Sequence, residues 1–330
     1  MSIRPLRLPR DLGALAEMLP QTFLYPDHPE WSLQSDETAE LTNMFGVFRR
    51  LWPLFRVVHA LIPSFRDGIR GFVTEEDEHL AAAVLYHRMG ATDVWDISTV
   101  GVLPGFRRRG LARQLVERAI TDIRERGGKR IVLGVIEGNV PARSLYRNLG
   151  FEDFGGFVKY ELPSAPASLD GSLPEGYTPT PLRRFDWRTR YEFAKRITPA
   201  STTSYDPVTV GKYKDPWIAR PLVMILLAVR RTAERDLVVH SASGDVAATY
   251  GHTVPMRGPG ITRIRVRLDP QHAILAEHLV RRALREAATF RPDLRVEISI
   301  SHWMEDVIAA AESAGMALRV DNRKMGLRLE

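Results

Sequence analysis

The chain has 330 residues, of which 44% are hydrophobic and 26% charged, and its formal net charge is +6. At roughly 100–200 residues per domain, this length predicts two globular domains. The absence of cysteine excludes disulfides, thiolate metal sites and a cysteine nucleophile, and the histidines lack metal-ligand spacing. The modest positive excess is not the dense basic stripe that nucleic-acid binding needs. With no apolar run near ~18 residues and no signal-peptide core, we expect a cytoplasmic protein without membrane contact.

Hydrophobic periodicity predicts an alternating series of strands and helices in the first half. The expected strands are residues 3–8, 69–74, 80–87, 94–102, 130–136 and a terminal group ending at 162. The expected helices are residues 12–22, 111–126 and 141–148, and residues 24–70 are expected to be irregular and aromatic-rich. The strand–helix–strand unit from Val94 to Ile136 implies a parallel pair with a right-handed crossover. Because the other connections are short, we predict an α/β fold with a mixed, mostly antiparallel sheet flanked by helices.

The second half of the chain repeats the pattern of the first. Helical positions such as Leu111 and Leu115 have apolar counterparts 164 residues later, at Leu275 and Leu279. The strand that follows each helix matches with an offset of 165. We therefore predict two domains of one plan, residues 1–162 and 177–330, joined by a linker rich in Pro, Ser, Ala and Gly at 163–176. The alternative is two unrelated α/β domains with similar helix periods.

The segment VGVLPGFRRRGLARQLV, which begins at Val100, runs from a strand through a loop into a helix. Free backbone N–H groups at a helix N-terminus bind anions, and the helix dipole adds to this attraction. Gly110 permits close approach to the backbone, and the three arginines before it raise the positive potential. The loop therefore suits a phosphate or pyrophosphate, although a solvated turn is the alternative. It is neither GxxxxGK[ST] nor GxGxxG, so the usual markers of ATP and nicotinamide chemistry are missing.

Two motifs together resemble a known family. The loop Arg107–Ala112 (RRRGLA) is similar to the [RQ]xxGx[GA] pyrophosphate loop of the GCN5-related N-acetyltransferases, the GNAT superfamily. The segment Asn139–Phe151 (NVPARSLYRNLGF) resembles the family's N-x-x-A-x-x-[LF]-Y-x-x-x-G-F segment. The resemblance covers residues 3–162 directly and reaches the second half only through the repeat. It implies acetyl-CoA as the cofactor and a small-molecule or protein amine as the acceptor.

The resemblance also assigns each motif to a part of the coenzyme. The loop amides would hold the pyrophosphate, and main-chain groups of the fourth strand would bond to the pantetheine arm. Asn139 stands where the family has a polar contact to that arm, and Tyr146 where many members keep a tyrosine close to the coenzyme sulfur. The implied coenzyme-binding set is Val100, Val102, Arg107, Arg108, Arg109, Gly110, Leu111, Ala112, Asn139, Ala142 and Tyr146.

Acetyl transfer to an amine needs an acid, a base and a donor to the oxyanion. Tyr146 is the candidate acid, since a phenol near pKa ~10 stays protonated where a thiol near ~8.5 ionises. A backbone N–H at a bulge near Val100 would stabilise the oxyanion. Asp96 is a candidate base, and the pleat of the strands decides between it and three acidic residues near the second strand: Glu75, Glu76 and Asp77. The alternatives are that Asn139 caps a helix, that Tyr146 packs in the core and that the acidic residues are solvated.

The second half has lost the informative positions of both motifs. By the offset, Gln271 replaces the first arginine of the loop, and Ile274 replaces its glycine. A β-branched residue there would crowd an anion, and the nearby Asp269 adds a negative charge. Met304 and Ala311 replace the asparagine and the tyrosine of the second motif. We therefore predict a GNAT-like second domain without productive coenzyme binding, which completes the acceptor cleft, shields the first domain or forms a homodimer contact.

Residues 41–65 interleave phenylalanine and tryptophan with arginine. This stretch is either a wall of a hydrophobic acceptor site or a surface packed against the second domain, and we favour the second because an exposed patch this apolar promotes aggregation. Three functions stay open. The first is an acetyl-CoA-dependent N-acetyltransferase, which the intact Tyr146 favours. The others are a catalytically silent acyl-CoA-binding sensor or partner-binding pseudoenzyme, and an O-acyl or longer-acyl transferase.

Overall fold

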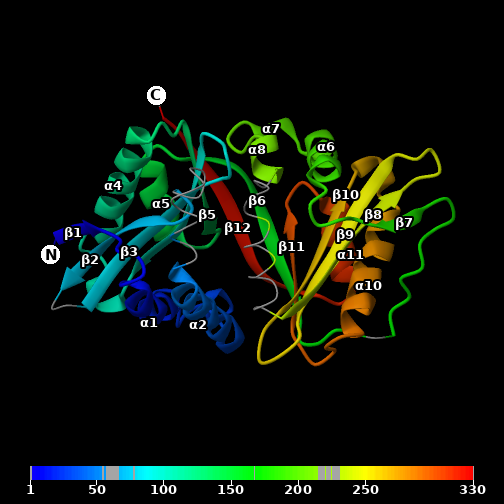
Figure 1. Ribbon diagram of the computed structural model, residues 1–330, viewed down its shortest axis with the longest axis horizontal. Coiled ribbons are helices and arrows are strands. Elements are labelled where there is room, and N and C mark those ends of the chain that lie inside the picture. Colours follow the sequence, from blue (N-terminus) through cyan, green and yellow to red (C-terminus); the bar gives the residue numbers. More distant parts are fainter. Residues whose placement is uncertain are drawn as a thin grey trace. The chain divides into compact units, whose positions relative to one another are not determined.

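The computed structural model describes residues 2–53, 67–76, 79–166, 168–214 and 231–329, with the single positions 56, 220 and 224. The chain forms two compact units, which are described separately. Unit 1 comprises Met1–Phe154, Ser201–Pro207 and Arg323–Glu330, and unit 2 comprises Gly155–Ala200 and Val208–Asn322. Each unit has its own hydrophobic core, and Figure 1 labels the strands and helices that form each unit.

The sheet of unit 1 is mixed, as predicted. β1 pairs antiparallel with β2, β2 with β3 and β3 with β4, whereas β4 and β5 are parallel. The last part of β12 follows beside β5. The strands are β1 (Ser2–Pro5), β2 (Arg70–Glu76), β3 (His79–Arg88), β4 (Val94–Val102), β5 (Arg130–Ile136) and β12 (Ala317–Arg328). The parallel pair is joined by the crossover helix α4 (Leu111–Glu125), and this confirms the predicted strand–helix–strand unit.

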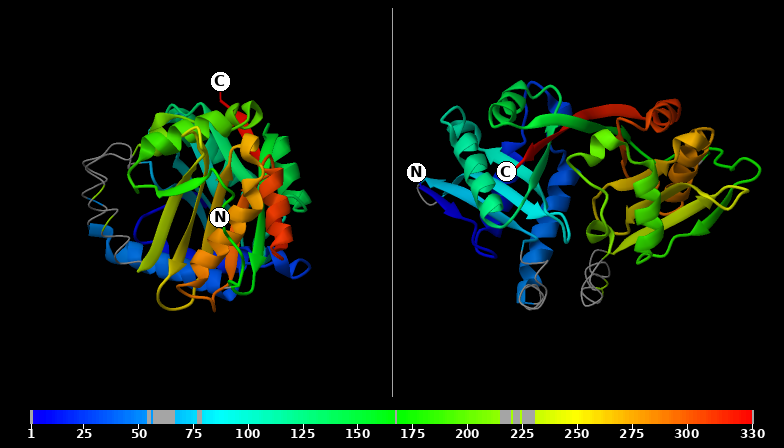
Figure 2. Two further views of the ribbon diagram at one scale, coloured as in Figure 1. Left: turned by 90° about the vertical axis from the view of Figure 1, so that its right-hand side faces the viewer. Right: turned by 90° about the horizontal axis from the view of Figure 1, so that it is seen from above.

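Helices cover both faces of this sheet (Figure 2). α4 and α5 (Val140–Asn148) lie on one face, and α1 (Leu12–Thr22) and α2 (Ser35–Arg50) belong to the other. Successive residues of β3 alternate between the two faces of the sheet. Val84 packs in the core beneath α4, and Leu85 packs on the other face against Leu15, Met18 and Leu19 of α1, which we call the α1 cluster. A strand covered on both faces is expected to be a nearly continuous apolar run, which β3 is. The two faces matter for function because the candidate site lies at the C-terminal part of β4, and residues on both faces of the sheet adjoin it.

The same order of elements recurs in unit 2. The strand order is β6–β11–β10–β9–β8–β7, and β10 and β11 form the parallel pair. The crossover helix α10 packs its apolar stripe into the unit's core, with Leu275 and Leu279 fully buried. The elements are β6 (Glu152–Leu162), β7 (Thr178–Pro181), α6 (Trp187–Ile197), α7 (Ala200–Thr203), α8 (Val210–Tyr213), β8 (Thr232–His240), β9 (Val246–Pro255), β10 (Thr262–Leu268), α10 (Leu275–Ala288), β11 (Val296–Ser301) and α11 (Glu305–Ser313). This recurrence confirms the tandem fold that the repeat predicts.

The units differ from the predicted domains by an exchange of strands. Arg323–Glu330 complete the sheet of unit 1, where Leu329 N donates to Lys129 O at 2.9 Å. Gly155–Leu162 belong instead to unit 2, where β6 pairs with β11. The prediction of boundaries at 162 and 177 missed this exchange because an apolar strand pattern does not specify which sheet the strand joins. The expected linker at 163–176 also belongs to unit 2, since its leucines pack against that core.

The expectation of an irregular stretch over residues 24–70 is wrong for its centre. The short 3₁₀ turn η1 (Pro29–Trp31) is followed by the 16-residue helix α2. A capping box starts α2, because Gln34 and Glu37 satisfy each other's backbone N–H groups. Its aromatic residues were predicted to pack against the second half, whereas Phe45 packs against the α1 cluster of unit 1. Residues 54, 55 and 57–65 of the aromatic stretch lie outside the described residues.

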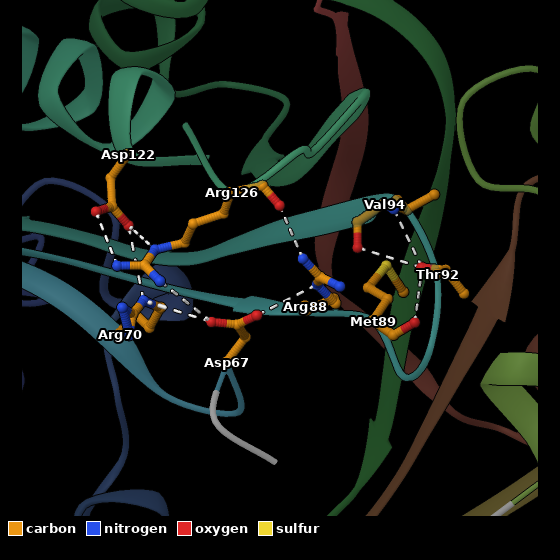
Figure 3. Close-up of polar contacts among 8 residues, drawn as sticks. All are labelled: Asp67, Arg70, Arg88, Met89, Thr92, Val94, Asp122 and Arg126. Atoms are coloured by element: carbon orange, nitrogen blue, oxygen red, sulfur yellow. Dashed lines mark hydrogen bonds and ion pairs between the residues drawn. The ribbon is translucent and has the colours of Figure 1, made fainter. Parts of the chain in front are cut away.

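An ion-pair network joins the end of α4 to the hairpin of β2 and β3 (Figure 3). Asp122 accepts hydrogen bonds from Arg126 Nε at 2.6 Å and from the Tyr86 hydroxyl at 2.7 Å. Asp67, which precedes β2, forms ion pairs with Arg88 at the end of β3 and with Arg126 at the end of α4. The C-terminal end of α4 is therefore anchored to the sheet, and the loop motif precedes the opposite, N-terminal end of this helix.

Two classes of site are absent from the part of the chain that the structure describes. No helix there is long and apolar enough to cross a membrane. No group of three acidic, histidine or cysteine side chains there could hold a metal ion.

Candidate active site

The parallel strands β4 and β5 pair over only part of their length. Their register runs from Val94 opposite Arg130 to Ile97 opposite Leu133 and then stops. β4 nevertheless continues to Val102 and β5 to Ile136. Beyond Ile97, β4 has no ladder partner on that edge, so an extended ligand has a strand's hydrogen-bonding edge available to it.

The ladder between β3 and β4 shows which groups of β4 face this open edge. Leu103 N donates to Ala81 O at 3.0 Å, so this pair is hydrogen-bonded. Hydrogen-bonded and non-bonded pairs alternate in an antiparallel ladder, so the N–H and C=O groups of Val100 and Val102 point toward β5. The Val102 carbonyl already accepts from Arg107 Nε at 3.2 Å. The free groups at this edge are therefore those of Val100 and the amide of Val102.

A bulge lies on β4 at Ser98, two residues before Val100. Leu85 pairs with Thr99 and Tyr86 with Ile97, so Ser98 is the extra residue. A bulge locally ends regular pairing and changes the direction of the strand, and bulges are frequent beside active sites. The sequence predicted the bulge near Val100, and it lies two residues earlier.

The loop after β4 leads through η3 (Pro104–Phe106) to an uncapped helix N-terminus. Gly110 is the N-cap residue of α4 with φ 77°, and no side chain caps the helix. Arg108 also has a left-handed backbone, with φ 65°. The first helical bond is from Gln114 N to Gly110 O, and the first turn has no acidic residue. The amides of Leu111, Ala112 and Arg113 are thus left for an anion, which fits the pyrophosphate of a coenzyme A.

The three arginines of the loop have different roles. Arg107 turns inward and donates from Nη2 to the carbonyl of Thr22 at 3.1 Å, in addition to its bond to β4. Arg109 donates to Gly105 O at 3.0 Å and stacks on Phe106, with its guanidinium carbon 5.1 Å from the ring centroid. The exposed side chain of Arg108 makes no polar contact within the described residues. Arg107 and Arg109 therefore stabilise the loop, and the guanidinium of Arg108 is available to an anion.

Asn139 and Tyr146 lie together on α5, beside the end of β5. Asn139 is the N-cap of α5, accepting from Ala142 N at 3.2 Å, so the capping alternative is realised. Its amide also donates to the Tyr25 hydroxyl at 3.4 Å. Burial, together with the neighbouring Tyr25, raises the pKa of the Tyr146 phenol well above its usual value. Tyr146 is buried, and its hydroxyl bonds to no described residue.

Tyr25 is a member of the site that sequence reasoning missed. Its phenol has a pKa raised by burial, with the Arg107 charge and the Asn139 hydrogen bond acting in the opposite direction. The ring meets Trp31 edge-on at 5.8 Å. Trp31 in turn lies over Gly138, where a Cβ would come within 2.5 Å of the indole. The only signal for this cluster was the aromatic richness of a stretch that looked irregular.

Asp96 points away from Tyr146, toward the opposite face of the sheet. Its neighbours Trp95 and Ile97 are buried beneath α4 with Tyr146, so Asp96 faces the α1 side. Its carboxylate lies 3.7 Å from Nδ1 of His87 on β3. Burial raises the pKa of the Asp96 carboxyl above its usual 3.8, although the nearby His87 and Lys324 oppose this shift.

The other candidate bases are less suitable than Asp96. Glu75 is held by Arg4, and this hydrogen bond lowers the pKa of the carboxyl. Asp77 lies outside the described residues. Glu76 is on β2, two strands away from the open edge of β4. His87 was not recognised from the sequence, because its pairing with Asp96 depends on the register of β3 and β4.

Next to this pair, unit 1 contains a cavity of about 240 Å³, which we call the α1–α2 cavity. Most of its described lining residues are leucine or phenylalanine, and α1 and α2 supply six of them. His87 and the bulge residues Ser98 and Thr99 line it as well. The cavity thus adjoins the open edge of β4 on the face opposite Tyr146.

Unit 2 retains the separation of strands but not the loop. Pairing of β10 with β11 ends at Ile264, although β10 continues to Leu268. No bulge interrupts the register of β9 and β10. The loop, with the 3₁₀ turn η5 (Pro270–His272), reaches its helix two residues sooner than in unit 1, and Ile274 has a right-handed φ of −52°. The Asp269 carboxylate accepts from Gln271 N at 3.0 Å and from Arg196 Nε at 3.1 Å. Asp269 thus places a carboxylate in the loop before α10, and Glu277 adds a second one in the first turn of that helix.

A strand pair that separates before a glycine-bearing loop and an uncapped crossover helix defines an acetyltransferase fold of the GNAT type. Residues 33–151 match the model of the Acetyltransferase (GNAT) family. Over 99% of this chain, the fold is similar to a tandem GNAT protein from the clavulanic acid biosynthesis pathway, at 14% identity, with TM-score 0.65 and 98% of that chain covered. A GCN5-related N-acetyltransferase from Sphaerobacter thermophilus gives TM-score 0.64 at 15% identity, covering 99% of this chain and 95% of the other. Residues 33–151 therefore belong to the Acetyltransferase (GNAT) family, and the whole chain has the fold of tandem GNAT proteins.

Sequence relatives match shorter regions. A mycothiol acetyltransferase from Beutenbergia cavernae is 30% identical over 99 residues, which are 30% of this chain and 33% of that protein. The mycothiol acetyltransferase of Thermobifida fusca is 42% identical over 74 residues, 22% of this chain and 23% of the other. The [ribosomal protein bS18]-alanine N-acetyltransferase of Salmonella typhimurium is 33% identical over 81 residues, 24% of this chain and 53% of the other. The chain thus matches a third or less of each mycothiol acetyltransferase and about half of the alanine N-acetyltransferase.

Proposed function

We propose that the chain is an N-acetyltransferase that transfers an acetyl group from acetyl-CoA to a primary amine, and that unit 1 carries the reaction. The observation that carries the proposal is a track along β4 and the loop after it, with unpaired backbone groups at both of its ends among the described residues. It starts at the open edge of β4 by Val100 and ends at the uncapped first turn of α4 behind Gly110. An extended arm joined to a diphosphate matches both the shape and the charge of this track.

The residues around the track divide into those that bind and those that move protons. The carbonyl of Val100 and the amide of Val102 bind and orient the arm, and the amides of Leu111 and Ala112 bind the diphosphate. When bound, acetyl-CoA supplies a thioester whose carbonyl carbon an amine attacks. The Val100 amide, next to the bulge, donates to the oxygen on which negative charge develops.

Proton transfers are assigned to groups on opposite faces of the sheet. As the C–N bond forms and the C–S bond breaks, Asp96 with His87 accepts the proton that the amine loses. Tyr146 donates a proton toward the sulfur. Its raised pKa keeps the phenol protonated at neutral pH, which a donor needs. An acid and a base on opposite sides of the open edge suit a direct transfer without a covalent enzyme intermediate.

The test combines thiol release with coenzyme binding on the full chain. Tyr146→Phe should lower kcat about 10²-fold or more, while the Kd for coenzyme A measured by calorimetry changes less than about twofold. Glu125→Gln, at the far end of α4, is the control for surface charge. A Tyr146→Phe enzyme with unchanged kcat would remove Tyr146 from the mechanism.

The pH profile tests Asp96. Because burial raises its pKa, the carboxylate that accepts a proton is lost as pH falls through the raised value, so kcat/KM should fall on the acid side. The charged and titratable groups near it are His87, Lys324 and Asp206. Asp96→Asn should lower kcat/KM and flatten this acid limb. Coenzyme binding with no thiol release across a broad amine panel would instead favour the silent acyl-CoA sensor.

A further inference from the structure

We propose that the acceptor is a primary amine carried on an apolar body of about nine carbon atoms, which the α1–α2 cavity encloses. This inference rests on the proposed function, since it names the acceptor of the same site. It follows from the chemistry of the cavity walls, from the position of their few polar atoms and from the cavity's size.

The polar side-chain atoms that the described residues contribute to the cavity are confined to its sheet side. Among the described lining residues, only Tyr86, His87, Ser98 and Thr99 carry polar side-chain atoms. The Tyr86 hydroxyl is occupied by Asp122, and the Ser98 hydroxyl donates to Leu85 O at 3.3 Å. His87 is thus the polar group in the lining that is paired with a candidate base, Asp96. An amine has its proton acceptor at this end, next to the bulge where acyl transfer is placed.

The rest of the cavity favours a hydrocarbon. Leu12, Leu41 and Phe45 are among the side chains that line it on α1 and α2. A hydroxyl or a second ammonium group placed against them would lose its water without gaining a partner, which costs several kcal/mol in an apolar site. Amino sugars and polyamines are therefore disfavoured. Each buried methylene, in contrast, is worth about fourfold in affinity.

The size of the cavity limits the length of the acceptor. An apolar cavity of ~150 Å³ is enough to hold benzene. The volume of the α1–α2 cavity, about 240 Å³, is about 1.6 times that of the benzene-sized cavity. At the same packing this volume takes about nine carbons, the size of a phenyl ring on a three-carbon chain.

The experiment measures thiol release from acetyl-CoA with the full chain and a series of amines. Ethylamine, butylamine, hexylamine, 3-phenylpropylamine and dodecylamine form the apolar series, and ethanolamine, glucosamine and spermidine form the polar set. We expect kcat/KM to rise about fourfold per methylene up to about nine carbons and then to fall. Comparable use of ethanolamine and 3-phenylpropylamine would overturn the inference, as would a preference for octanoyl-CoA over acetyl-CoA, which would assign the cavity to the acyl chain.

Substitution of Leu41 distinguishes a specificity role from a structural one. Leu41→Trp should move the optimum to shorter amines and Leu41→Ala to longer ones, with the Kd for acetyl-CoA unchanged. Thr42→Trp, on the exposed neighbouring position of α2, is the matched control and should leave the optimum in place. If both Leu41 variants only lower activity uniformly, the cavity does not select the acceptor.

The failure of this inference is separable from that of the proposed function. If calorimetry finds no binding of acetyl-CoA, or if no amine releases thiol, the proposed function fails. If acetyl-CoA binds and polar amines are acetylated as well as apolar ones, the function stands and the acceptor class is wrong.

Discussion

Replacing Gly110 with alanine should weaken coenzyme binding. A control substitution at the other end of the same helix, Gly127→Ala, should lower the unfolding free energy by the same amount but leave coenzyme binding unchanged. Gly110 has φ 77°, where a Cβ costs about 1–2 kcal/mol. The added Cβ would come no closer than 3.7 Å to Gln114 Nε2, so no clash adds to this strain. Gly127, just beyond the C-terminus of α4, has φ 73° and nothing within 4 Å of an added Cβ. Gly110→Ala and Gly127→Ala therefore impose the same strain on α4, but only the first places a methyl group where the diphosphate approaches.

Both variants should lose about 1–2 kcal/mol of unfolding free energy, which thermal unfolding followed by circular dichroism would show as similar drops in Tm. Coenzyme binding should separate them. Loss of one charge-assisted hydrogen bond at about 1.5–3 kcal/mol raises Kd roughly tenfold to a hundredfold. Calorimetry with coenzyme A should find this increase for Gly110→Ala and a change below about twofold for Gly127→Ala. Equal Kd values for the two variants would show that the diphosphate does not bind at the α4 N-terminus.

Three further outcomes are expected. Although burial opposes it, hydrogen bonds from Arg126 and Tyr86 hold the pKa of the Asp122 carboxyl below its usual 3.8. The stability that these hydrogen bonds to the Asp122 carboxylate contribute is therefore present above the unfolded-state pKa and is lost as pH falls through the lower pKa of the folded state. Asp122→Asn should cost about 1–3 kcal/mol at pH 7, and the cost measured by urea unfolding should shrink near pH 3; a cost independent of pH would contradict the assignment. Gly138→Ala should displace Trp31, seen as a changed tryptophan emission and a higher KM, and an unaltered spectrum would refute the contact. Calorimetry should find one coenzyme A per chain; two would mean that unit 2 also binds it.

The parts of the site that follow from short-range chemistry were predictable from the sequence. Gly110 just before an amphipathic helix identifies a loop with exposed amides, and the end of β4 at Val102 was predicted to the residue. The helical periodicity of α4 is strong because one face packs in the core, where Leu115 and Ile123 are fully buried. Local pattern and tertiary packing agree there, so the prediction holds.

The parts that depend on distant pairing were not predictable. α2 has no buried residue, and Phe45 and Phe48 are only half-buried where they line a cavity, so the apolar periodicity of this helix is weak. His87 joins Asp96 only through the register of β3 and β4, and Tyr25 reaches Asn139 across 114 positions of sequence. The exchange of β6 and the end of β12 was invisible for the same reason, because strand pairing is set by the whole sheet and not by the strand alone.

The two halves also show why a fold can persist after its site is lost. The core of unit 2 needs only apolar residues at helical and strand spacing, and its crossover helix retains them. The coenzyme site needs a bulge, a left-handed glycine and a first turn without a competing carboxylate, and unit 2 lacks all three. Ile274→Gly alone would restore only the second feature, since the loop would still be two residues short and Asp269 would still bond to Gln271 N. Gain of coenzyme binding in unit 2 should therefore require replacement of the whole loop, including Asp269.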